Sequence, residues 1–541
     1  MNMAPFDGAA TAHLDAAHVG DIHGAFGKIA HDHDHKGDWR KRLMTLLAIV
    51  GPGLIVMVGD NDAGAFGTYT QAAQNYGTSL LWTLLLLVPV LYVNQEMVLR
   101  LGAVTGVGHA RLIFARFGKF WGAFSVVDLF LLNALTIVTE FIGVSLGLSY
   151  LGLPKFWGVV AAAVVTVLAA STGSFRRFER FMMALVFGSL ALVPVFMMIH
   201  PPASQVAHDF LVPQLPKGGK LSDVMLLIIA IVGTTVAPWQ LFFQQSYVID
   251  KRITPRFIGY EKIDLWLGIL FVVLGAGAMM AFTAAALAGR PEFGHFTDAA
   301  GVARGLEHAG GKMAGVLFAV ALIDASIIGA GAVSLSTAYA LGDVFKLKHS
   351  LHRKATDAPE FYLVYAGLIA LAAALVLIPG TPLGLLTNAV QTLAGVLLPS
   401  ATVFLLLLCN DKAVLGPWVN GRWLNLFTGA GIAALVMLSV ILTASVLYPD
   451  LDERVIVGVL VAGSAVTVAA WAIMSFARRR GRAPIDRSGR EHWRMPPLHR
   501  LAPVRMSTGE KLWMGVLRGY LVVAGGLVLL RIVQLAISRH V

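Results

Sequence analysis

Two aspartates interrupt an otherwise apolar stretch near the start of the chain. Asp60 and Asp62 lie in the segment GDNDAG, residues 59–64, between long apolar runs. A bare carboxylate in lipid costs several kcal/mol, so we expect this segment to face a polar cavity. There Asp62 can offer a hard oxygen ligand to a cation. Asp60 either joins that metal site or caps the interrupted helix.

The composition requires a membrane around these aspartates. The 541 residues are 57% hydrophobic and 13% charged, with mean hydropathy +0.72, whereas soluble domains carry about 25% charge. Apolar runs of about 18 residues or more recur from residue 43 onward. We therefore predict an all-α polytopic protein whose partner is the lipid bilayer. The single cysteine, Cys409, excludes an intramolecular disulfide.

The charge distribution predicts the topology. We predict apolar helices at 45–74, 79–99, 121–147, 155–173, 181–200, 222–248, 262–289, 313–342, 359–379, 384–409, 423–447 and 454–476, and a candidate at 513–537. If the N-terminus is cytoplasmic, most Lys and Arg fall in cytoplasmic segments, ten of them in 477–511. This distribution explains the net charge of +11 without a nucleic-acid partner and predicts a multi-pass protein of the cell membrane.

A second interruption matches the first. The sixth predicted span contains GTTVAPWQ, residues 233–240, where Pro238 removes a helical hydrogen bond. The two interruptions are five spans apart, so the second half would enter the membrane from the opposite side. Paired interrupted helices indicate an inverted repeat with a binding site near the midplane.

This repeat organises the chain into consecutive segments. The predicted units are a disordered His-containing tail (1–42), the first repeat of spans 1–5 (43–200), the second repeat of spans 6–10 (221–409), peripheral spans 11–12 (422–476), a basic cytoplasmic linker (477–511) and a possible thirteenth span (512–541). The tail contains HDHDH at 31–35, which either binds a divalent metal or is simply disordered. The last segment either spans the membrane or lies on its surface.

Three further polar residues lie within predicted spans. Glu140 is either a second carboxylate near the ion or a buried structural acid. Gln391 could offer a carbonyl oxygen to the ion, hold a water of the hydrated ion, or bond a neighbouring helix. Gln240 follows the second interruption and is similarly placed.

Several long motifs resemble the Nramp family of divalent metal transporters. They are GPGLIVMVGDNDAGAFGTYTQAAQNYG, GTTVAPWQLFFQQS, NAVQTLAGVLLPSATVFLLLLCNDKAVLG and NGRWLNL, and they keep the family's order over about residues 43–430. The resemblance implies a LeuT-type fold of five plus five spans with additional C-terminal helices. It also implies that Glu140 and Gln391 match family positions near the ion.

The chain departs from the family pattern at the ion site. Asp62 is kept, but Ala65 stands where the family has asparagine, and Ala237 stands where it has methionine. Loss of the soft thioether removes a preference for transition metals. We therefore place Ala237 in the predicted metal site, beside Asp62, Glu140, Gln391, Gln240 and Asp60.

The family's proton-carrying residues are also replaced. Trp239 and Gln244 stand where the family has histidines, and Ile137 stands where it has a proton-carrying aspartate. The pattern resembles the Nramp-related magnesium transporter branch, which implies Mg²⁺ and Mn²⁺ transport without proton coupling. The alternative is a proton-coupled Mn²⁺/Fe²⁺ importer. An amino-acid symporter would need a helix-terminus carboxylate site and usually lacks an aspartate in the interruption.

An enzyme is not expected. The chain contains no H-E-x-x-H zinc motif, P-loop or G-x-S-x-G elbow. We expect no resident cofactor, because Mg²⁺ or Mn²⁺ would be the transported substrate.

Overall fold

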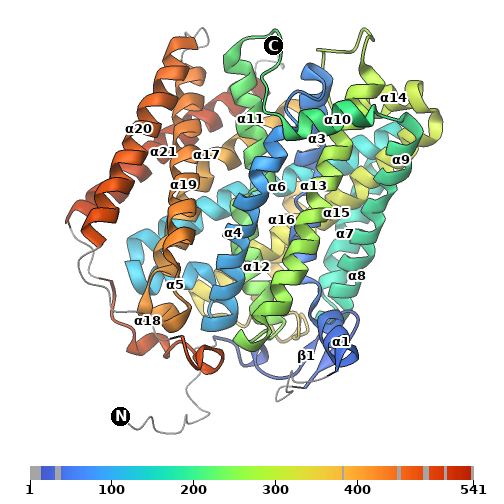
Figure 1. Cartoon of the computed structure of the whole chain (residues 1–541). Helices are drawn as coiled ribbons and strands as arrows, with labels where there is room; N and C mark the ends of the chain where they lie inside the picture. Colours follow the sequence, from blue (N-terminus) through green and yellow to red (C-terminus); the bar gives the residue numbers. More distant parts are fainter. Residues whose placement is uncertain are drawn as a thin grey trace.

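The computed structural model describes residues 14–30, 38–379, 383–447, 453–478, 487–504 and 508–537, which are almost entirely helical (Figure 1). The first half contains α1 (Trp39–Ile49), α2 (Pro52–Val58), α3 (Ala63–Tyr76), α4 (Trp82–Thr105), α5 (His109–Phe117), α6 (Lys119–Tyr150), α7 (Lys155–Ala170), α8 (Phe175–Gly188), α9 (Leu192–Ile199) and α10 (Ala203–Leu211). The second half contains α11 (Leu221–Thr235), α12 (Pro238–Asp250), α13 (Ile258–Leu287), α14 (Ala299–Gly310), α15 (Lys312–Phe345), α16 (Pro359–Val376) and α17 (Leu383–Cys409). The remaining helices are α18 (Lys412–Leu415), α19 (Arg422–Leu447), α20 (Glu453–Arg478) and α21 (Thr508–Ile537).

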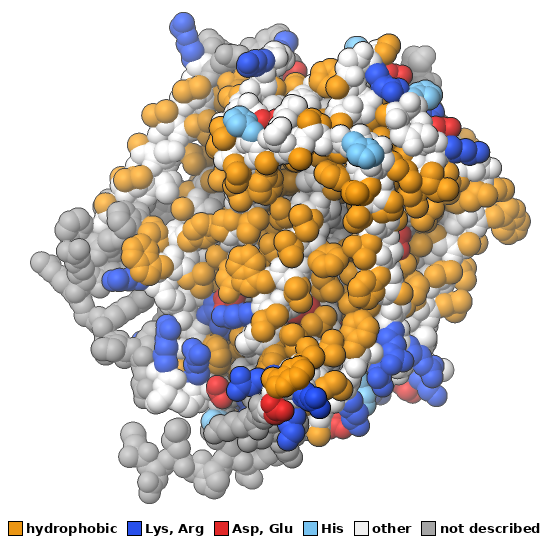
Figure 2. Space-filling model, turned by 45° about the vertical axis from the view of Figure 1, so that its right-hand side comes forward, with side chains coloured by type: hydrophobic (Ala, Val, Ile, Leu, Met, Phe, Trp, Pro, Cys, Tyr) orange, Lys and Arg blue, Asp and Glu red, His pale blue; other side chains and the backbone are white. Residues whose placement is uncertain are grey.

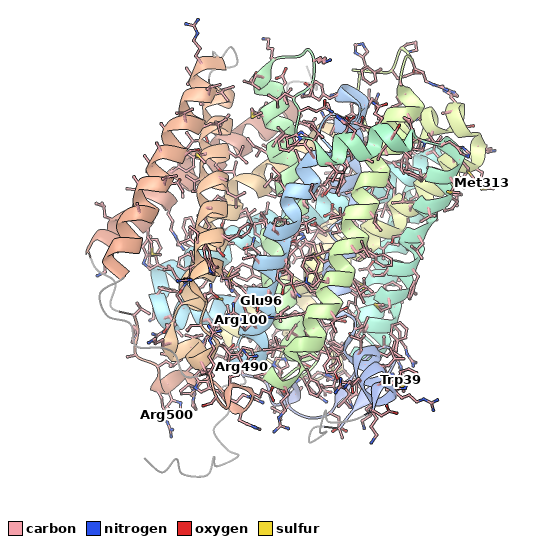
Figure 3. All side chains as sticks on the ribbon, in the orientation of Figure 1. Trp39, Glu96, Arg100, Met313, Arg490 and Arg500 are labelled. Carbon is pink, nitrogen blue, oxygen red and sulfur yellow. The ribbon has the colours of Figure 1, made fainter. Side chains whose placement is uncertain are left out.

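The helices form an apolar bundle with two polar ends. Among the described residues, nine helical segments are long and apolar enough to cross a membrane, or ten if the bent pair of α1 and α2 counts as one span. Figure 2 shows hydrophobic side chains over the middle of one face and Lys and Arg gathered near its lower end. Figure 3 labels Trp39, Arg490 and Arg500 near this lower end, which we call the basic face, and Met313 near the upper part of the bundle.

Both predicted interruptions are present. The first span is α2 and α3, with residues 59–62 between them outside the helices. The sixth span is α11 and α12, separated by Val236 and Ala237, and Pro238 is the first residue of α12. The long helix α15 packs on α6, α13 packs on α2, and α17 packs on α11. The two broken spans therefore lie inside the bundle, enclosed by continuous helices from both repeats.

The first span has a second bend that was not expected from the sequence. We expected one helix from residue 45 to the interruption, but α1 and α2 meet at an angle of 48°. Gly51 lies between them with φ 155°, a conformation that favours glycine, and Pro52 then begins α2. The local sequence VGPG carried this signal.

The N-terminal region also differs from the expected disordered tail. Residues 16–18 form a 3₁₀ turn, and β1 (Ile22–His23) pairs antiparallel with β2 (Lys28–Ile29), with Ile22 opposite Ile29. Both isoleucines are buried, because this hairpin packs against the bundle. The tract HDHDH lies outside the described residues.

The basic linker is attached to the basic face where the structure describes it. Trp418 donates its indole N–H to the carbonyl of Arg490, and the Val504 amide donates to the carbonyl of Arg116. After the linker, α21 packs on α17 and α19. Helix α21 is thus docked on the second repeat, while its predicted role as a thirteenth span stays a prediction.

Candidate functional site

Asp62 marks the start of the second half of the broken first span. Its Oδ1 accepts a hydrogen bond from the Ala65 amide at 2.9 Å, so Asp62 is the N-cap of α3. Asp60 therefore does not cap α3. Of the two roles that the sequence left open for Asp60, helix cap or member of the metal site, the first is excluded at this helix. Instead, Asp60 Oδ1 accepts a hydrogen bond from the side-chain amide of Gln240, on α12. The two aspartates thus face different partners, one on each broken span.

Glu140 reaches the first interruption from α6. Its Oε2 accepts a hydrogen bond from the Ala63 amide at 3.2 Å. The carboxyl groups of Glu140 and Asp62 are also close enough to hydrogen-bond when one of them carries a proton. On the other side, a Cβ at Gly329 of α15 would lie 2.6 Å from the Glu140 carboxyl carbon. Glycine at 329 therefore leaves room for the Glu140 carboxyl between α6 and α15.

Gln240 connects the two broken spans. It donates to Asp60 on the first span, and its Oε1 accepts from Gln95 Nε2 of α4 at 3.1 Å. A second connection joins the hydroxyl groups of Tyr69 on α3 and Thr235 on α11, at 2.7 Å. Gln95 was not among the residues that the sequence predicted for the site.

Gln391 places α17 against both interruptions. A Cβ at Gly64 would lie 1.6 Å from Gln391 Nε2, so the amide rests directly on the backbone of α3. A Cβ at Gly233 of α11 would lie 2.4 Å from the Gln391 carbonyl oxygen. The structure therefore brings Asp60, Gln240 and Gln391 to the two interruptions, together with Asp62 and Glu140.

Ala237 occupies the second interruption itself. Its backbone is extended, with φ −89° and ψ 145°, and it immediately precedes Pro238. Its carbonyl accepts from the Gln240 amide at 3.2 Å. The methyl group can donate no electron pair to a metal, so any contribution of Ala237 to ion binding comes from its backbone or from the space it leaves.

Many buried polar atoms around the interruptions have no hydrogen-bond partner among the residues that the structure describes. They include Asp60 Oδ2, Asn61 Oδ1, Thr68 Oγ1, Gln95 Oε1, Glu140 Oε1, Thr234 Oγ1, both amide atoms of Gln244, and Gln391 Nε2. Buried polar groups normally have a partner, and unpartnered ones are costly at membrane depth. This donor set, which is mostly oxygen, suits water molecules and a partly hydrated hard cation.

The described residues form no preformed coordination site for a dehydrated metal ion. Among them, no group of three or more His, Cys, Asp or Glu side chains is arranged to hold a metal. The carboxylates at the first interruption are those of Asp60, Asp62 and Glu140. The other donors in the region are amides, hydroxyls and backbone carbonyls.

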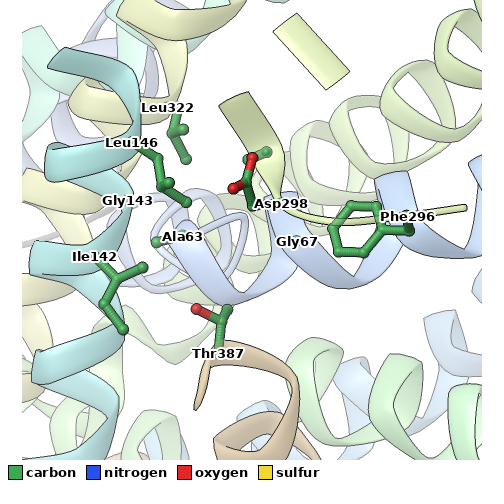
Figure 4. A pocket seen from close by; sticks show the side chains of 10 residues that line it. Ala63, Gly67, Ile142, Gly143, Leu146, Phe296, Asp298, Leu322 and Thr387 are labelled. Atoms are coloured by element: carbon green, nitrogen blue, oxygen red, sulfur yellow. The ribbon is translucent and has the colours of Figure 1, made fainter. Parts of the chain in front are cut away.

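A small pocket lies beside the first interruption, on the side of the bundle where α14 is found, away from the basic face (Figure 1). It is lined by Ala63 and Gly67 of α3, Gly143 and Leu146 of α6, and Asp298 beside α14. Figure 4 shows the Asp298 carboxyl group directed into this pocket. Its Oδ1 also caps α14 by accepting from the Gly301 amide at 2.8 Å. The pocket thus joins the interruption to one side of the bundle.

Comparisons with known proteins agree with this architecture. Residues 53–445 match the family described as natural resistance-associated macrophage protein-like, Nramp. The chain is 29% identical over 409 residues to a protein of Ralstonia nicotianae named divalent metal cation transporter MntH, covering 71% of this chain and 87% of that protein. It is 28% identical over 417 residues to the protein of the same name from Burkholderia ambifaria, covering 74% and 89%.

A solved structure confirms the fold. A mutant of the Eremococcus coleocola manganese transporter superposes with a TM-score of 0.62 at 20% identity, covering 84% of this chain and 98% of that one. At this identity the likeness shows the fold alone. The predicted all-α, LeuT-type inverted repeat of five plus five spans with additional C-terminal helices is thereby confirmed. The family match covers more than half of the chain, and the protein therefore belongs to the Nramp family.

Proposed function

We propose that this protein carries Mg²⁺ and Mn²⁺ into the cell, and that a partly hydrated ion binds between the broken first and sixth spans. The basic face is then cytoplasmic, as the distribution of Lys and Arg suggests, and the protein lies in the cell membrane. Its curated relatives, named divalent metal cation transporters, support cation transport. The Nramp-related magnesium transporter branch remains the one that the residue pattern resembles.

The observation that carries the proposal is the chemistry of the donor set. Asp62, Glu140, Asp60 and Gln391 present oxygen and amide groups, and the soft methionine of the family pattern is replaced by Ala237. Oxygen donors favour hard cations, whereas thioether and thiolate sulfur favours softer transition metals. Mg²⁺ is usually held by one or two carboxylates and keeps several waters, which matches a polar interior with few carboxylates.

One observation favours the alternative of a proton-coupled importer. The neighbouring Asp62 and Glu140 carboxyl groups can share a proton between them. If a metal ion displaced that proton, transport would exchange metal for protons. The two candidates therefore differ in where this proton goes, which flux measurements can follow.

The test of cation transport is a flux assay in proteoliposomes that contain the purified protein. We expect uptake of Mg²⁺ and Mn²⁺, and we expect Asp62→Asn to lose at least nine-tenths of it, because the substitution removes the carboxylate that faces Glu140 at the first interruption. The matched control is Asp223→Asn, an acid-to-amide change at an exposed position in the first turn of α11. Mg²⁺ uptake that persists in Asp62→Asn, or Fe²⁺ uptake without any of Mg²⁺, would contradict the proposal.

A further inference from the structure

Residues 14–30, which we call the N-terminal strap, contact parts of the bundle that are far away in the sequence. The strap contains the 3₁₀ turn and the β1–β2 hairpin, and it lies at the basic face beside α1 (Figure 1). It is no part of either repeat and contributes no group to the ion site. Its contacts fall on four elements, which are α1, α8, the end of α12 and the loop between α15 and α16.

The first anchor of the strap is an ion pair with the α15–α16 loop. Asp15 Oδ1 lies 2.5 Å from Arg353 Nη2, and the Arg353 Nε–H also donates to the same carboxylate. Asp15 Oδ2 accepts a third hydrogen bond, from the His349 amide at 2.9 Å. The Asp15 side chain is 1% exposed. A buried, two-pronged Arg–carboxylate pair is among the stronger polar contacts in proteins.

The second anchor holds the end of α12, the helix that follows the second interruption. His18 lies 3.6 Å from Asp250 Oδ1, and its Nε2 hydrogen-bonds the His349 carbonyl at 3.0 Å. In return, Arg252 donates to the carbonyls of Ala17 and Asp21, each at 2.9 Å. The strap is therefore clamped to α12 through both side-chain and backbone groups.

The third anchor is the hairpin, which is seated on α1. A Cβ at Gly24 would lie 1.8 Å from the Ala48 carbonyl oxygen, so only glycine lets the two backbones approach so closely. The next residue, Ala25, donates its amide to Glu179 of α8 at 2.5 Å, and Arg180 donates to the Ala25 carbonyl at 2.9 Å. The hairpin thus joins α1 to α8.

Helix α1 has its own joint to the rest of the first span. At the bend, Lys251 Nζ donates to the carbonyls of Ile49 and Val50, the end of α1, at 2.5 and 3.0 Å. Across the bend, Asp264 of α13 accepts from the Gly51 and Gly53 amides, the start of α2, at 3.1 and 2.7 Å. The Lys251 ammonium thus lies at the C-terminal end of α1, and the Asp264 carboxylate lies at the N-terminal end of α2. Each charge has the sign that the helix dipole favours at that end.

We propose that the N-terminal strap is a latch that holds α1 against α8, α12 and the α15–α16 loop, and that its release lets α1 pivot at Gly51 and open the basic face toward the ion site. With the strap docked, the residues between α2 and α3 are buried, and the pocket at this interruption is lined on its far side by Asp298, beside α14 and away from the basic face. The proposal depends on the proposed function only in one respect, namely that the site to which the latch controls access is a cation site. Docking of the strap is independent of any ion.

The test measures strap release and opening of the basic face separately, as the rates at which a membrane-impermeant maleimide labels single cysteines. Each cysteine is introduced in a Cys409→Ala background, and the maleimide is applied to the basic face. Ile29→Cys lies in the strap and Val58→Cys lies at the end of α2; the native side chains are 5% and 3% exposed. We expect Asp15→Arg and Arg353→Asp each to raise both labelling rates at least tenfold. The combined charge swap should return both rates toward the starting values.

The matched control is Lys348→Ala, which removes an exposed charge from the same loop and should change neither rate. Faster labelling of Ile29→Cys with unchanged Val58→Cys would show a strap that gates nothing, and unchanged rates at both positions would show no latch. Either result overturns the proposal. Because labelling needs no transported ion, these outcomes stay separate from a failure of the metal-flux assay.

Discussion

At the scale of single residues, Gly64 is the position where backbone and ion site meet most closely. The amide of Gln391 rests on it, and a Cβ there would lie 1.6 Å from Nε2. We predict that Gly64→Ala displaces Gln391 and lowers apparent cation affinity about 10- to 100-fold, the usual effect of disturbing groups that support a metal. Concentration dependence of uptake measures this change. Gly277→Ala, where a Cβ meets nothing within 4 Å, should leave it unaltered.

We predict that strap docking depends on pH through His18. Burial lowers the pKa of His18 from its ordinary value, although the nearby Asp250, Asp15 and Asp343 carboxylates oppose this effect and His349 adds to it. A released strap would hold His18 near its ordinary pKa of about 6.5. The released state therefore binds more protons, so docking weakens as pH falls through about 6.5.

This pH dependence is measured by labelling Ile29→Cys between pH 5.5 and 8, normalised to the labelling of Lys348→Cys at an exposed position. The substitution His18→Gln should remove the rise in the labelling rate of Ile29→Cys at low pH. The neighbouring His349 does not titrate in this range, because Asp343 outweighs the opposing effect of burial and raises the pKa of His349 to about 9. Identical pH profiles with and without the His18→Gln substitution would show that another group governs docking.

At the scale of elements, a buried cation helps to hold α21 against the bundle. The Arg518 guanidinium lies 4.2 Å from the ring centres of Trp121 and Phe124 and 4.5 Å from that of Phe404. Desolvated cation–π contacts contribute about 2 kcal/mol. We predict that Arg518→Ala lowers the melting midpoint in detergent while metal flux persists, since α21 lies outside both repeats. Lys511→Ala, at an exposed position of the same helix, should change neither, and loss of flux in Arg518→Ala would place α21 within the transport machinery.

The elements that the sequence predicted well are those with local signals. Apolar runs marked the spans, and Asp62 and Pro238 marked the interruptions, because glycine, proline and charge act on the backbone where they stand. Docking of the strap could not be predicted in this way. Its order depends on partners such as Glu179 and Arg353, which lie 154 and 338 positions away from their contacts. The same holds for Asp60, whose partner Gln240 lies 180 positions away on another helix.

At the scale of the whole molecule, the two sides of the bundle differ around the interruptions. The pocket beside Asp298 leads to Ala63 at the first interruption, and α1 with its latch lies at the basic face. Inverted repeats allow the two sides to open in turn around a fixed site. The driving force then depends on which charges move with the metal.

We predict that metal entry moves no protons. Trp239, Gln244 and Ile137 cannot titrate in the physiological range, and they are buried at the positions where the family pattern has proton carriers. A proton on Glu140 can remain there as a hydrogen-bond donor to Asp62, so ion binding need not displace it. A divalent ion gains about 4.6 kcal/mol from a 100 mV inside-negative potential, enough to drive uptake without a proton partner.

A pH-sensitive dye inside proteoliposomes measures this coupling while Mg²⁺ or Mn²⁺ is added outside. The interior pH should stay constant during metal uptake, and uptake should rise as the interior is made more negative with a potassium gradient and valinomycin. Glu140→Gln keeps the shape of the side chain and a donor toward Asp62, so it should retain measurable flux if the proton never leaves. Acidification that follows metal entry at a clamped potential, and that disappears in Glu140→Gln, would instead identify Glu140 as a proton carrier and favour the proton-coupled importer.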